Sequence, residues 1–161
     1  MNVYDFDKTI YNGDSTFHFY LFCLKRHKII LKLTPRLAKK FFLFKIKKIT
    51  KTQFKESMYE FLKYIDLDID LPEFWDSHIK NIKEWYLKKQ CEDDVIISAS
   101  PEFLLEPACN RLQIKNLMAS RVDPHTGKYT GVNCSGEEKV RRYREVFGDE
   151  KKLLIQTKLM F

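Results

Sequence analysis

The stretch Asn2-Val3-Tyr4-Asp5-Phe6-Asp7-Lys8-Thr9-Ile10 joins a short apolar strand to a loop that carries two aspartates one residue apart. Residues i and i+2 of a strand point to the same side, so Asp5 and Asp7 are predicted to converge where the strand ends. Two carboxylates held together repel each other, and a fold keeps them mainly when a cation bridges them or one carries a proton. Both conditions suit phosphoryl transfer, with one carboxylate as nucleophile and its neighbour as general acid. The alternative that this stretch alone leaves open is a loop with two solvated acids.

Three segments, in order along the chain, resemble motifs of the haloacid dehalogenase superfamily of phosphatases. Asp5-Phe6-Asp7-Lys8-Thr9 resembles the first motif, D-x-D-x-T. The second motif is a strand that ends in Ser or Thr, and Asp94-Val95-Ile96-Ile97-Ser98 looks like it. The third is a helix-borne Lys, and Gly136-Glu137-Glu138-Lys139 looks like that one. The order and spacing are similar to the phosphoserine-phosphatase-like branch, in which a helical cap follows the first motif.

This resemblance implies hydrolysis of a small phosphorylated metabolite through a phosphoaspartate. Asp5 would attack phosphorus. Asp7 would protonate the leaving alkoxide and then deprotonate the attacking water. Ser98 and the N–H of Ala99 would donate hydrogen bonds to phosphate oxygens. Lys139 would neutralise charge on the phosphate and stabilise the Asp5 carboxylate.

The resemblance also implies a Mg²⁺ cofactor, bound by the Asp5 carboxylate and the Asp7 backbone carbonyl. Thr9 would stiffen the loop and would not touch the substrate. Taken singly, a Ser at a strand end such as Ser98 is usually a turn former. A Lys such as Lys139 usually lies on a solvated helix face. Their order relative to the two aspartates therefore carries the functional interpretation.

Strand signals lie on either side of a long helical stretch. Residues 15–88 show apolar side chains at helical spacing and no strand signal. Outside it, the pattern predicts strands at 2–6, 95–98 and 116–122, a small hairpin at 123–131, a helix at 136–147 and a last strand at 152–157. We therefore predict an α/β fold: a Rossmann-like parallel-sheet core from residues 1–14 and 89–161, with an inserted helical cap at 15–88 and a sheet incomplete at the C-terminus.

Several helix starts can be predicted from capping residues and prolines. Thr52 or its neighbour is expected to cap the third helix of the cap, and Pro72 is expected to start the fourth. In the core, Ser100 precedes Pro101, the favoured order for an N-cap and a first helical residue. The helix from Pro101 to Arg111 would then direct its first N–H groups toward a bound phosphate.

Positive charge is concentrated in one part of the chain. No acidic residue lies between Asp14 and Glu56, whereas twelve cations do, more than the formal net charge of +7 of the whole chain. The predicted helix at 36–49 is basic and rich in Phe. Three interpretations stay open: a cap helix with solvated cations, a helix lying on an anionic membrane surface, or a surface that steers an anionic substrate. Nucleic-acid binding is not expected, because no recognised motif accompanies the charge.

Composition and cysteine spacing indicate in which cellular environment the protein is expected. The 161 residues are 44% hydrophobic, and no apolar run reaches the roughly 18–20 residues that span a bilayer. No secretory signal precedes the first predicted strand. Four scattered cysteines show neither C-x-x-C pairs nor zinc-like spacing, and the four histidines do not cluster. We predict a reduced, cytoplasmic protein.

The fourth motif of the superfamily, an acidic pair that completes the Mg²⁺ site, has no counterpart at its expected place. That place is near Lys158, after the predicted strand Leu153-Leu154-Ile155, and no acid follows Glu150. We interpret the ending as a truncation or a reading-frame slip, which predicts weaker Mg²⁺ binding. Two alternatives therefore stay open: an inactive relative that binds phosphate ligands through Ser98 and Lys139, and a protein that binds an anionic membrane through its basic helix.

Overall fold

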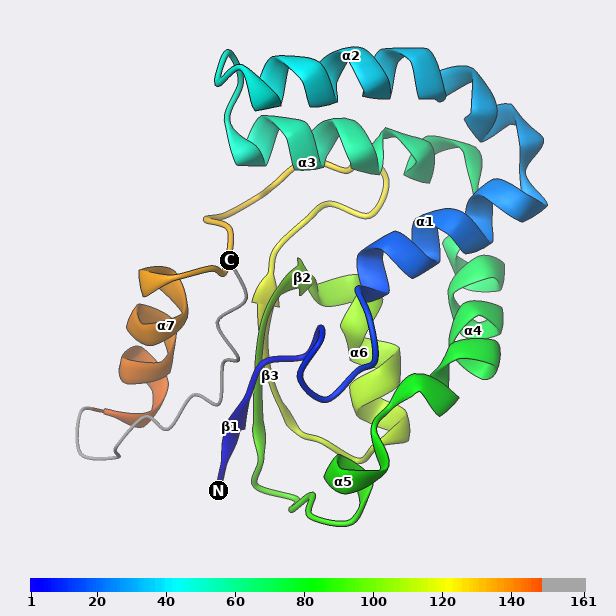
Figure 1. The fold of residues 1–161 in the computed structure, drawn as a ribbon. Coiled ribbons are helices and arrows are strands. Elements are labelled where there is room, and N and C mark those ends of the chain that lie inside the picture. The colour runs from blue at the N-terminus through cyan, green and yellow to red at the C-terminus, as the bar shows by residue number, and fades with distance from the viewer. Residues whose placement is uncertain (149–161) are drawn as a thin grey trace.

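The computed structural model describes residues 1–148 of the chain. Its centre is a parallel sheet of three strands in the order β1-β2-β3, formed by β1 (Val3–Tyr4), β2 (Val95–Pro101) and β3 (Asn116–Ser120) (Figure 1). Val3 pairs with Val95, and Ile96 pairs with Leu117. The parallel sheet with helices on both faces confirms the predicted Rossmann-like α/β fold.

Within residues 1–148, five helices lie between β1 and β2 in the sequence, and two follow β2. The first five are α1 (Ser15–Arg26), α2 (Thr34–Lys45), α3 (Lys51–Tyr59), α4 (Leu67–His78) and α5 (Glu84–Leu87). Short 3-10 turns at Lys28–Leu33, Glu60–Tyr64 and Ile79–Asn81 join them. The last two are α6 (Glu102–Arg111) and α7 (Glu137–Phe147). No helix among these is long and apolar enough to cross a membrane, a finding that applies to residues 1–148.

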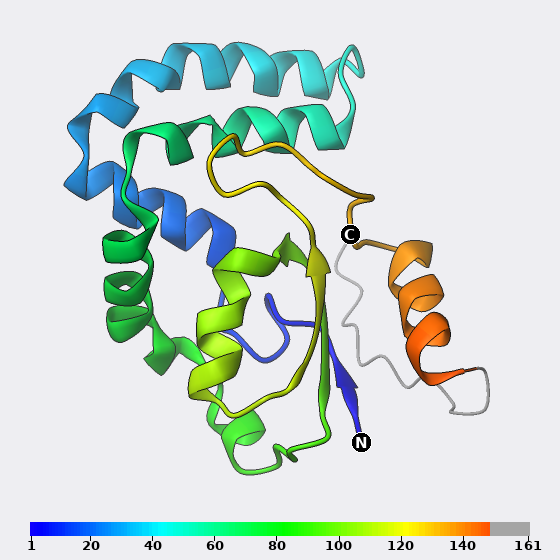
Figure 2. The ribbon, with the colours of Figure 1, turned by 180° about the vertical axis from the view of Figure 1, so that it is seen from behind.

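The alternation of side chains along the strands divides the core into two layers. Tyr4 and Ile96 belong to the larger apolar cluster, with the aromatic side chains of α1 and α4 and with α6. Their neighbours Val3, Val95 and Ile97 face the other way and pack with Tyr143 of α7. Figure 2 shows α7 alone on one side of the sheet and the other helices on the opposite side or above it. Successive strand residues point to opposite faces, so apolar strands of this kind can be covered on both.

The third cap helix begins two residues earlier than predicted. Thr50, and not Thr52, is the N-cap of α3: its hydroxyl accepts a hydrogen bond from Gln53 N, and Gln53 Oε1 accepts one from Thr50 N. This reciprocal capping box needs Gln or Glu three residues after the cap, a requirement that Thr50 meets through Gln53.

The prediction that Pro72 starts the fourth cap helix was wrong. The helix α4 begins at Leu67, with Asp66 as its N-cap, and Pro72 lies inside it. A proline in a helix interior removes one backbone hydrogen bond. Burial of the Phe74 and Trp75 side chains on α4 offsets that loss, and Trp75 Nε1 also donates a 2.7 Å hydrogen bond to the Leu104 carbonyl.

The segment after β3 folds back on the cap. Val122 and Tyr129 form an antiparallel bridge, which confirms the predicted hairpin, although β3 itself ends at Ser120. Tyr129 N donates to the Glu56 carboxylate of α3 at 3.1 Å. The predicted strand at 152–157 and the expected position of the fourth motif lie outside the described residues.

Candidate active site

Asp5 and Lys139 form an ion pair where β1 ends. Lys139 Nζ lies 2.7 Å from Asp5 Oδ2, and the other carboxylate oxygen of Asp5 accepts a hydrogen bond from Phe6 N at 2.9 Å. The Lys139 side chain is 9% exposed and that of Asp5 is 25% exposed. The Lys of the third motif-like segment therefore lies in contact with the Asp of the first. The roles of both residues stay predictions.

Asp7 is held by two donors from different elements. Its Oδ1 accepts a hydrogen bond from Ser15 N at the start of α1, at 2.6 Å, and its Oδ2 accepts one from the Ser100 hydroxyl, at 2.5 Å. Burial, and then the nearby Asp14 carboxylate, raise the pKa of Asp7, while the hydrogen bonds from Ser100 and Ser15 oppose the rise. A carboxyl group held in this way is suited to carrying and releasing a proton at a fixed position.

Ser98 and Ala99 lie in the C-terminal part of β2, which continues to Pro101, three residues beyond the predicted strand end at Ser98. Ser98 is buried, and its hydroxyl accepts a hydrogen bond from Ser100 N at 3.1 Å. Asp5, Asp7, Ser98 and Ala99 all line one cavity of about 520 Å³. In parallel sheets the ligand site usually lies outside the carboxyl ends of the strands, as this cavity does.

The predicted capping role of Ser100 was wrong. The N-cap of α6 is Pro101, whose side chain has no hydrogen-bond acceptor, and the Ser100 hydroxyl is bonded elsewhere. It donates to Asp7 and therefore accepts the 3.0 Å hydrogen bond that it shares with the Thr16 hydroxyl. Ser100 is thus a site residue that the sequence argument missed. The available signal was its i+2 spacing from Ser98, which places both on one side of an extended strand.

The loop after Asp7 is closed by backbone hydrogen bonds. The N–H groups of Thr9, Ile10 and Tyr11 all donate to the Phe6 carbonyl, at 3.0 to 3.3 Å. Thr9 therefore belongs to a tight turn, in the place expected of a residue that stiffens the loop. Gly13 ends the turn with φ +119°, and a Cβ atom there would lie 2.5 Å from the His18 ring.

The α3 residue Lys55 contacts the end of β2. Lys55 on α3 donates hydrogen bonds to the Ala99 carbonyl at 3.0 Å and to Asn133 Oδ1 at 3.4 Å. Burial lowers the pKa of Lys55 to about 8, and the positive charge of Lys51 adds to the effect. Nothing in the sequence separates Lys55 from the other eleven cations of its segment, so only the structure identifies it.

The cap side of the cavity is mostly apolar. Phe44 and Phe54 stack with ring centroids 5.2 Å apart. The residues of 15–88 that line the cavity are Thr16, Phe17, Phe44, Lys51, Phe54, Lys55, Met58 and Tyr59. The cavity therefore has a polar floor made by the ends of β1 and β2 and an aromatic roof with two cations. Such a division suits a ligand with a charged end and a less polar body.

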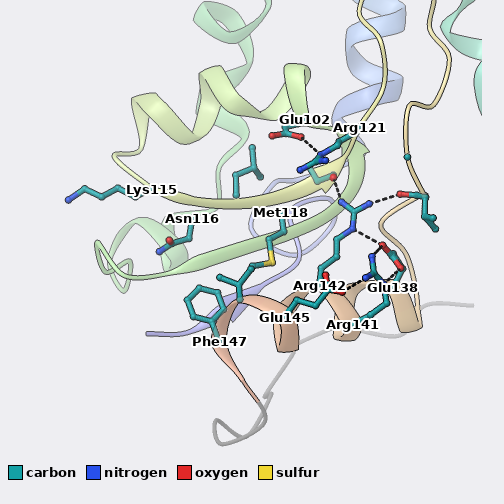
Figure 3. Close-up of a pocket in the computed structure, with 15 residues that line it drawn as sticks. Glu102, Lys115, Asn116, Met118, Arg121, Glu138, Arg141, Arg142, Glu145 and Phe147 are labelled. Carbon is teal, nitrogen blue, oxygen red and sulfur yellow. Dashed lines mark hydrogen bonds and ion pairs between the residues drawn. The ribbon is translucent and has the colours of Figure 1, made fainter.

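A hydrogen-bond network attaches α7, the helix that carries Lys139, to the sheet. Arg142 donates to the Glu138 carboxylate at 2.8 Å, to the Ala119 carbonyl at 2.7 Å and to the Val132 carbonyl at 2.6 Å (Figure 3). Hydrogen bonds from Arg141 and Arg142 lower the pKa of Glu138 to about 2. These contacts join α7 to β3 and to the loop after it. A second cavity, of about 530 Å³, lies between α7 and β3 and contains none of the candidate catalytic residues.

The donor set at the end of β1 fits Mg²⁺ in kind. Mg²⁺ prefers carboxylate, carbonyl and water oxygens, and the Asp5 carboxylate and Asp7 carbonyl are of that type. Within residues 1–148, the one group of three closely spaced acidic or thiol side chains is Cys91, Asp93 and Asp94. It precedes β2, whereas the site lies at the other end of that strand. These two oxygens are therefore the candidate Mg²⁺ ligands that the described part of the chain offers at this site.

Solved structures share the fold at low sequence identity. A protein of unknown function from Bordetella pertussis Tohama I is 19% identical, with a TM-score of 0.69 over 91% of this chain and 73% of the other. A phosphoserine phosphohydrolase-like protein from Francisella tularensis subsp. tularensis SCHU S4 is 15% identical, with a TM-score of 0.53 over 92% and 73%. A phospho-aspartyl intermediate analogue of phosphoserine phosphatase is 18% identical, with a TM-score of 0.50 over 91% and 71%.

Sequence comparison gives the family. No curated protein matches the chain. The family model for haloacid dehalogenase-like hydrolases, in contrast, matches residues 3–154, nearly the whole sequence. With the motif-like segments gathered at one end of a parallel sheet, this match shows that the chain belongs to the haloacid dehalogenase-like hydrolase family.

Proposed function

We propose that this chain is a Mg²⁺-dependent phosphatase that hydrolyses a small phosphomonoester through a phosphoaspartate on Asp5. The observation that carries the proposal is the 2.7 Å contact between Asp5 and Lys139, beside a cavity that Asp7 and Ser98 also line. A nucleophilic carboxylate, a second carboxyl group, a cation and a hydroxyl at one strand edge are the groups that phosphoryl transfer through an aspartate requires.

The reaction proceeds in two steps. In the first, a carboxylate oxygen of Asp5 attacks phosphorus, the bond to the leaving oxygen breaks, and Asp7 gives that oxygen its proton. In the second, water attacks the same phosphorus and passes a proton to Asp7, and phosphate leaves with Asp5 restored as a carboxylate. The paired donors on Asp7 from Ser15 and Ser100 support this role, because they hold its carboxyl group in one orientation.

The other groups at the strand ends bind the phosphate. Lys139 offsets the negative charge that builds up on the phosphoryl oxygens, and the Ser98 hydroxyl and Ala99 N–H donate hydrogen bonds to them. The Asp5 carboxylate and the Asp7 carbonyl would hold Mg²⁺, which supplies positive charge next to the transferred group. With two protein ligands from the described residues, water molecules would complete most of its coordination.

The cap would bind the rest of the substrate. The stacked rings of Phe44 and Phe54 line the same cavity as the strand ends that would hold the phosphate. Lys55 adds a positive charge at the boundary between roof and floor. These features support a small phosphorylated metabolite as the substrate, with its leaving group against the cap.

The test is hydrolysis of p-nitrophenyl phosphate, measured with Mg²⁺ and with a chelator. We expect Mg²⁺-dependent turnover that Asp5→Asn abolishes, because the amide is no longer a nucleophile. Asp68→Asn is the matched control, since it makes the same chemical change at an exposed residue of α4 and should leave turnover unchanged. Circular dichroism of each variant checks that it is folded.

A folded wild-type protein with no turnover above Asp5→Asn would contradict the proposal. Phosphate binding would then decide between the remaining alternatives. The Lys139 cation and the buried Ser98 hydroxyl would still favour a bound anion, so titration with inorganic phosphate that depends on Lys139 would support an inactive, phosphate-binding relative.

We also propose a reducing compartment, the cytoplasm. All four cysteines are free thiols, and Cys23, Cys109 and Cys134 are buried. Burial raises the pKa of Cys109 to about 12, which keeps it a thiol at neutral pH. Disulfides found by mass measurement in protein isolated under thiol-trapping conditions would contradict the proposed reducing compartment.

A further inference from the structure

The helix α2 has an apolar face that no other part of the described chain covers. None of the α2 residues is buried. Phe42 is 62% exposed, and Ile46, at the C-cap, is 44% exposed. We define the outer α2 face as the exposed residues Pro35, Ala38, Lys39, Phe42, Lys45 and Ile46. In Figures 1 and 2 the helix lies at the edge of the molecule, with α3 between it and the sheet.

The opposite face of the same helix already has a partner. Phe44 stacks on Phe54 of α3 and lines the cavity of the candidate active site. At about 100° per residue, Phe42 and Ile46 each lie about 160° around the helix from Phe44. The outer α2 face therefore does not pack into the protein core. Burial within the chain does not explain why its exposed side chains are large and apolar.

The charges around this face are of one sign. Lys39 and Lys45 border its apolar side chains, and Lys47 and Lys48 follow directly in the sequence. The sequence contains no acid from residue 15 to residue 55. Arg36 pairs with Glu60 of the cap at 3.1 Å. In contrast, no described carboxylate lies within ion-pair distance of Lys39, Lys45, Lys47 or Lys48.

We propose that the outer α2 face docks on an anionic lipid bilayer. Phe42 and Ile46 enter the boundary between headgroups and acyl chains, while the lysines beside them extend toward lipid phosphates. The positive charge of this face favours a lipid surface over a second copy of the chain. A second copy would bring another uncompensated set of lysines to the interface, whereas anionic lipids attract each lysine. The docking uses no candidate catalytic residue and does not depend on the proposed phosphatase activity.

The test is co-sedimentation of the whole chain with vesicles at low salt. One set contains phosphatidylcholine alone and the other contains phosphatidylcholine with phosphatidylglycerol. We expect binding to the second set only, and release at high salt, because screening weakens the attraction between lysines and lipids. Lys39→Glu should weaken binding at least about fivefold. Phe42→Ser should weaken it roughly tenfold, since an inserted apolar ring is lost.

Two matched controls lie on other surfaces. Ile69→Ser changes an apolar side chain of α4 that is 52% exposed, and Lys80→Glu reverses an exposed charge. Both should leave binding unchanged. The outer α2 residues face away from the core, so the variants there should fold, which circular dichroism verifies.

Several results would overturn the proposal: no binding to anionic vesicles at low salt, equal binding to both vesicle sets, or binding that Ile69→Ser or Lys80→Glu weakens as much as the α2 variants do. A dimer in sedimentation velocity that Phe42→Ser dissociates would instead identify a second copy as the occupant. Hydrolysis measured without vesicles is independent of all these outcomes, so a failure here leaves the proposed phosphatase reaction untouched.

Discussion

Lys55 of the cap donates a 3.0 Å hydrogen bond to the carbonyl of Ala99, the residue directly after the candidate phosphate-binding Ser98. The helix α3 is thus joined to β2 at the strand end where the proposed chemistry takes place. The contact also keeps an ammonium group partly buried beside the cavity. Both consequences can be measured.

The first prediction concerns catalysis. Lys55→Met removes the cap's charge at the cavity and its hydrogen bond to the core. We expect kcat/KM for p-nitrophenyl phosphate to fall roughly tenfold, the effect of about 1.4 kcal/mol on the barrier. Lys63→Met, which removes an exposed lysine outside this cavity, is the control. An unchanged kcat/KM in folded Lys55→Met would show that the cation does not act on the substrate.

The second prediction concerns the dependence of stability on pH. Burial lowers the pKa of Lys55 from its ordinary value of 10.5 to about 8. Between these two values the unfolded chain binds a proton at Lys55 that the folded chain does not. The free energy of unfolding therefore gains a term that rises with pH, and the full cost of the buried charge is present below about pH 8.

Lys55→Met should remove that term. Urea unfolding of both proteins at several pH values is the measurement. The stability of the variant relative to the wild type should be highest below about pH 8 and should decline toward pH 10.5. A difference that stays constant over the whole range would mean that the pKa of Lys55 is not lowered.

The third prediction tests the hydrogen bond between Ser100 and Asp7. Ser100→Ala removes one of the two hydrogen bonds to the Asp7 carboxylate and leaves the one from Ser15 N–H. The carboxyl group is then less well oriented toward the leaving oxygen, so we expect kcat to fall on the order of tenfold to a hundredfold with a smaller change in KM. Ser77→Ala on α4 is the control. Wild-type kcat in Ser100→Ala would rule out a positioning role.

The fourth prediction tests the attachment of α7. Arg142 is 17% exposed and donates to Glu138 and to two backbone carbonyls outside its helix, whereas Arg141 is 54% exposed and pairs only within the helix. Arg142→Met should lower the free energy of unfolding by about 2 kcal/mol and reduce activity through Lys139. Arg141→Met should change stability by less than about 0.5 kcal/mol. Equal effects in urea unfolding would contradict the distinction.

The fifth prediction concerns the return of the hairpin to the cap. Gly127 has φ +70°, and a Cβ atom there would lie 2.6 Å from Tyr59 Cβ and 2.7 Å from the Tyr59 carbonyl oxygen. Gly127→Ala should therefore destabilise the protein by at least about 2 kcal/mol. Gly131→Ala, whose Cβ would meet its nearest neighbour at 3.9 Å, should have little effect on the melting temperature. Similar melting temperatures for the two variants would contradict the close approach.

The sequence by itself determined the α/β fold class of this protein. The helical spacing of residues 15–88 between strand signals, together with the order of the three motif-like segments, was sufficient to predict the α/β fold, because strand and helix periods are local properties of the chain. The motif-like segments also identified Asp5 and Lys139, which the structure brings to 2.7 Å. The catalytic roles and the boundaries of the cap stay predictions.

The tertiary structure decided which polar groups meet. Ser100 was predicted to cap a helix, yet its hydroxyl donates to Asp7, 93 positions away in the sequence. Lys55 is one of twelve similar cations until α3 packs over the ends of the strands. Likewise, the position of Pro72 inside α4 follows from the burial of Phe74 and Trp75, not from local propensity. Local patterns predict helices and strands. A hydrogen bond between distant segments forms only after those elements pack, and so does the burial that offsets the cost of a proline inside a helix.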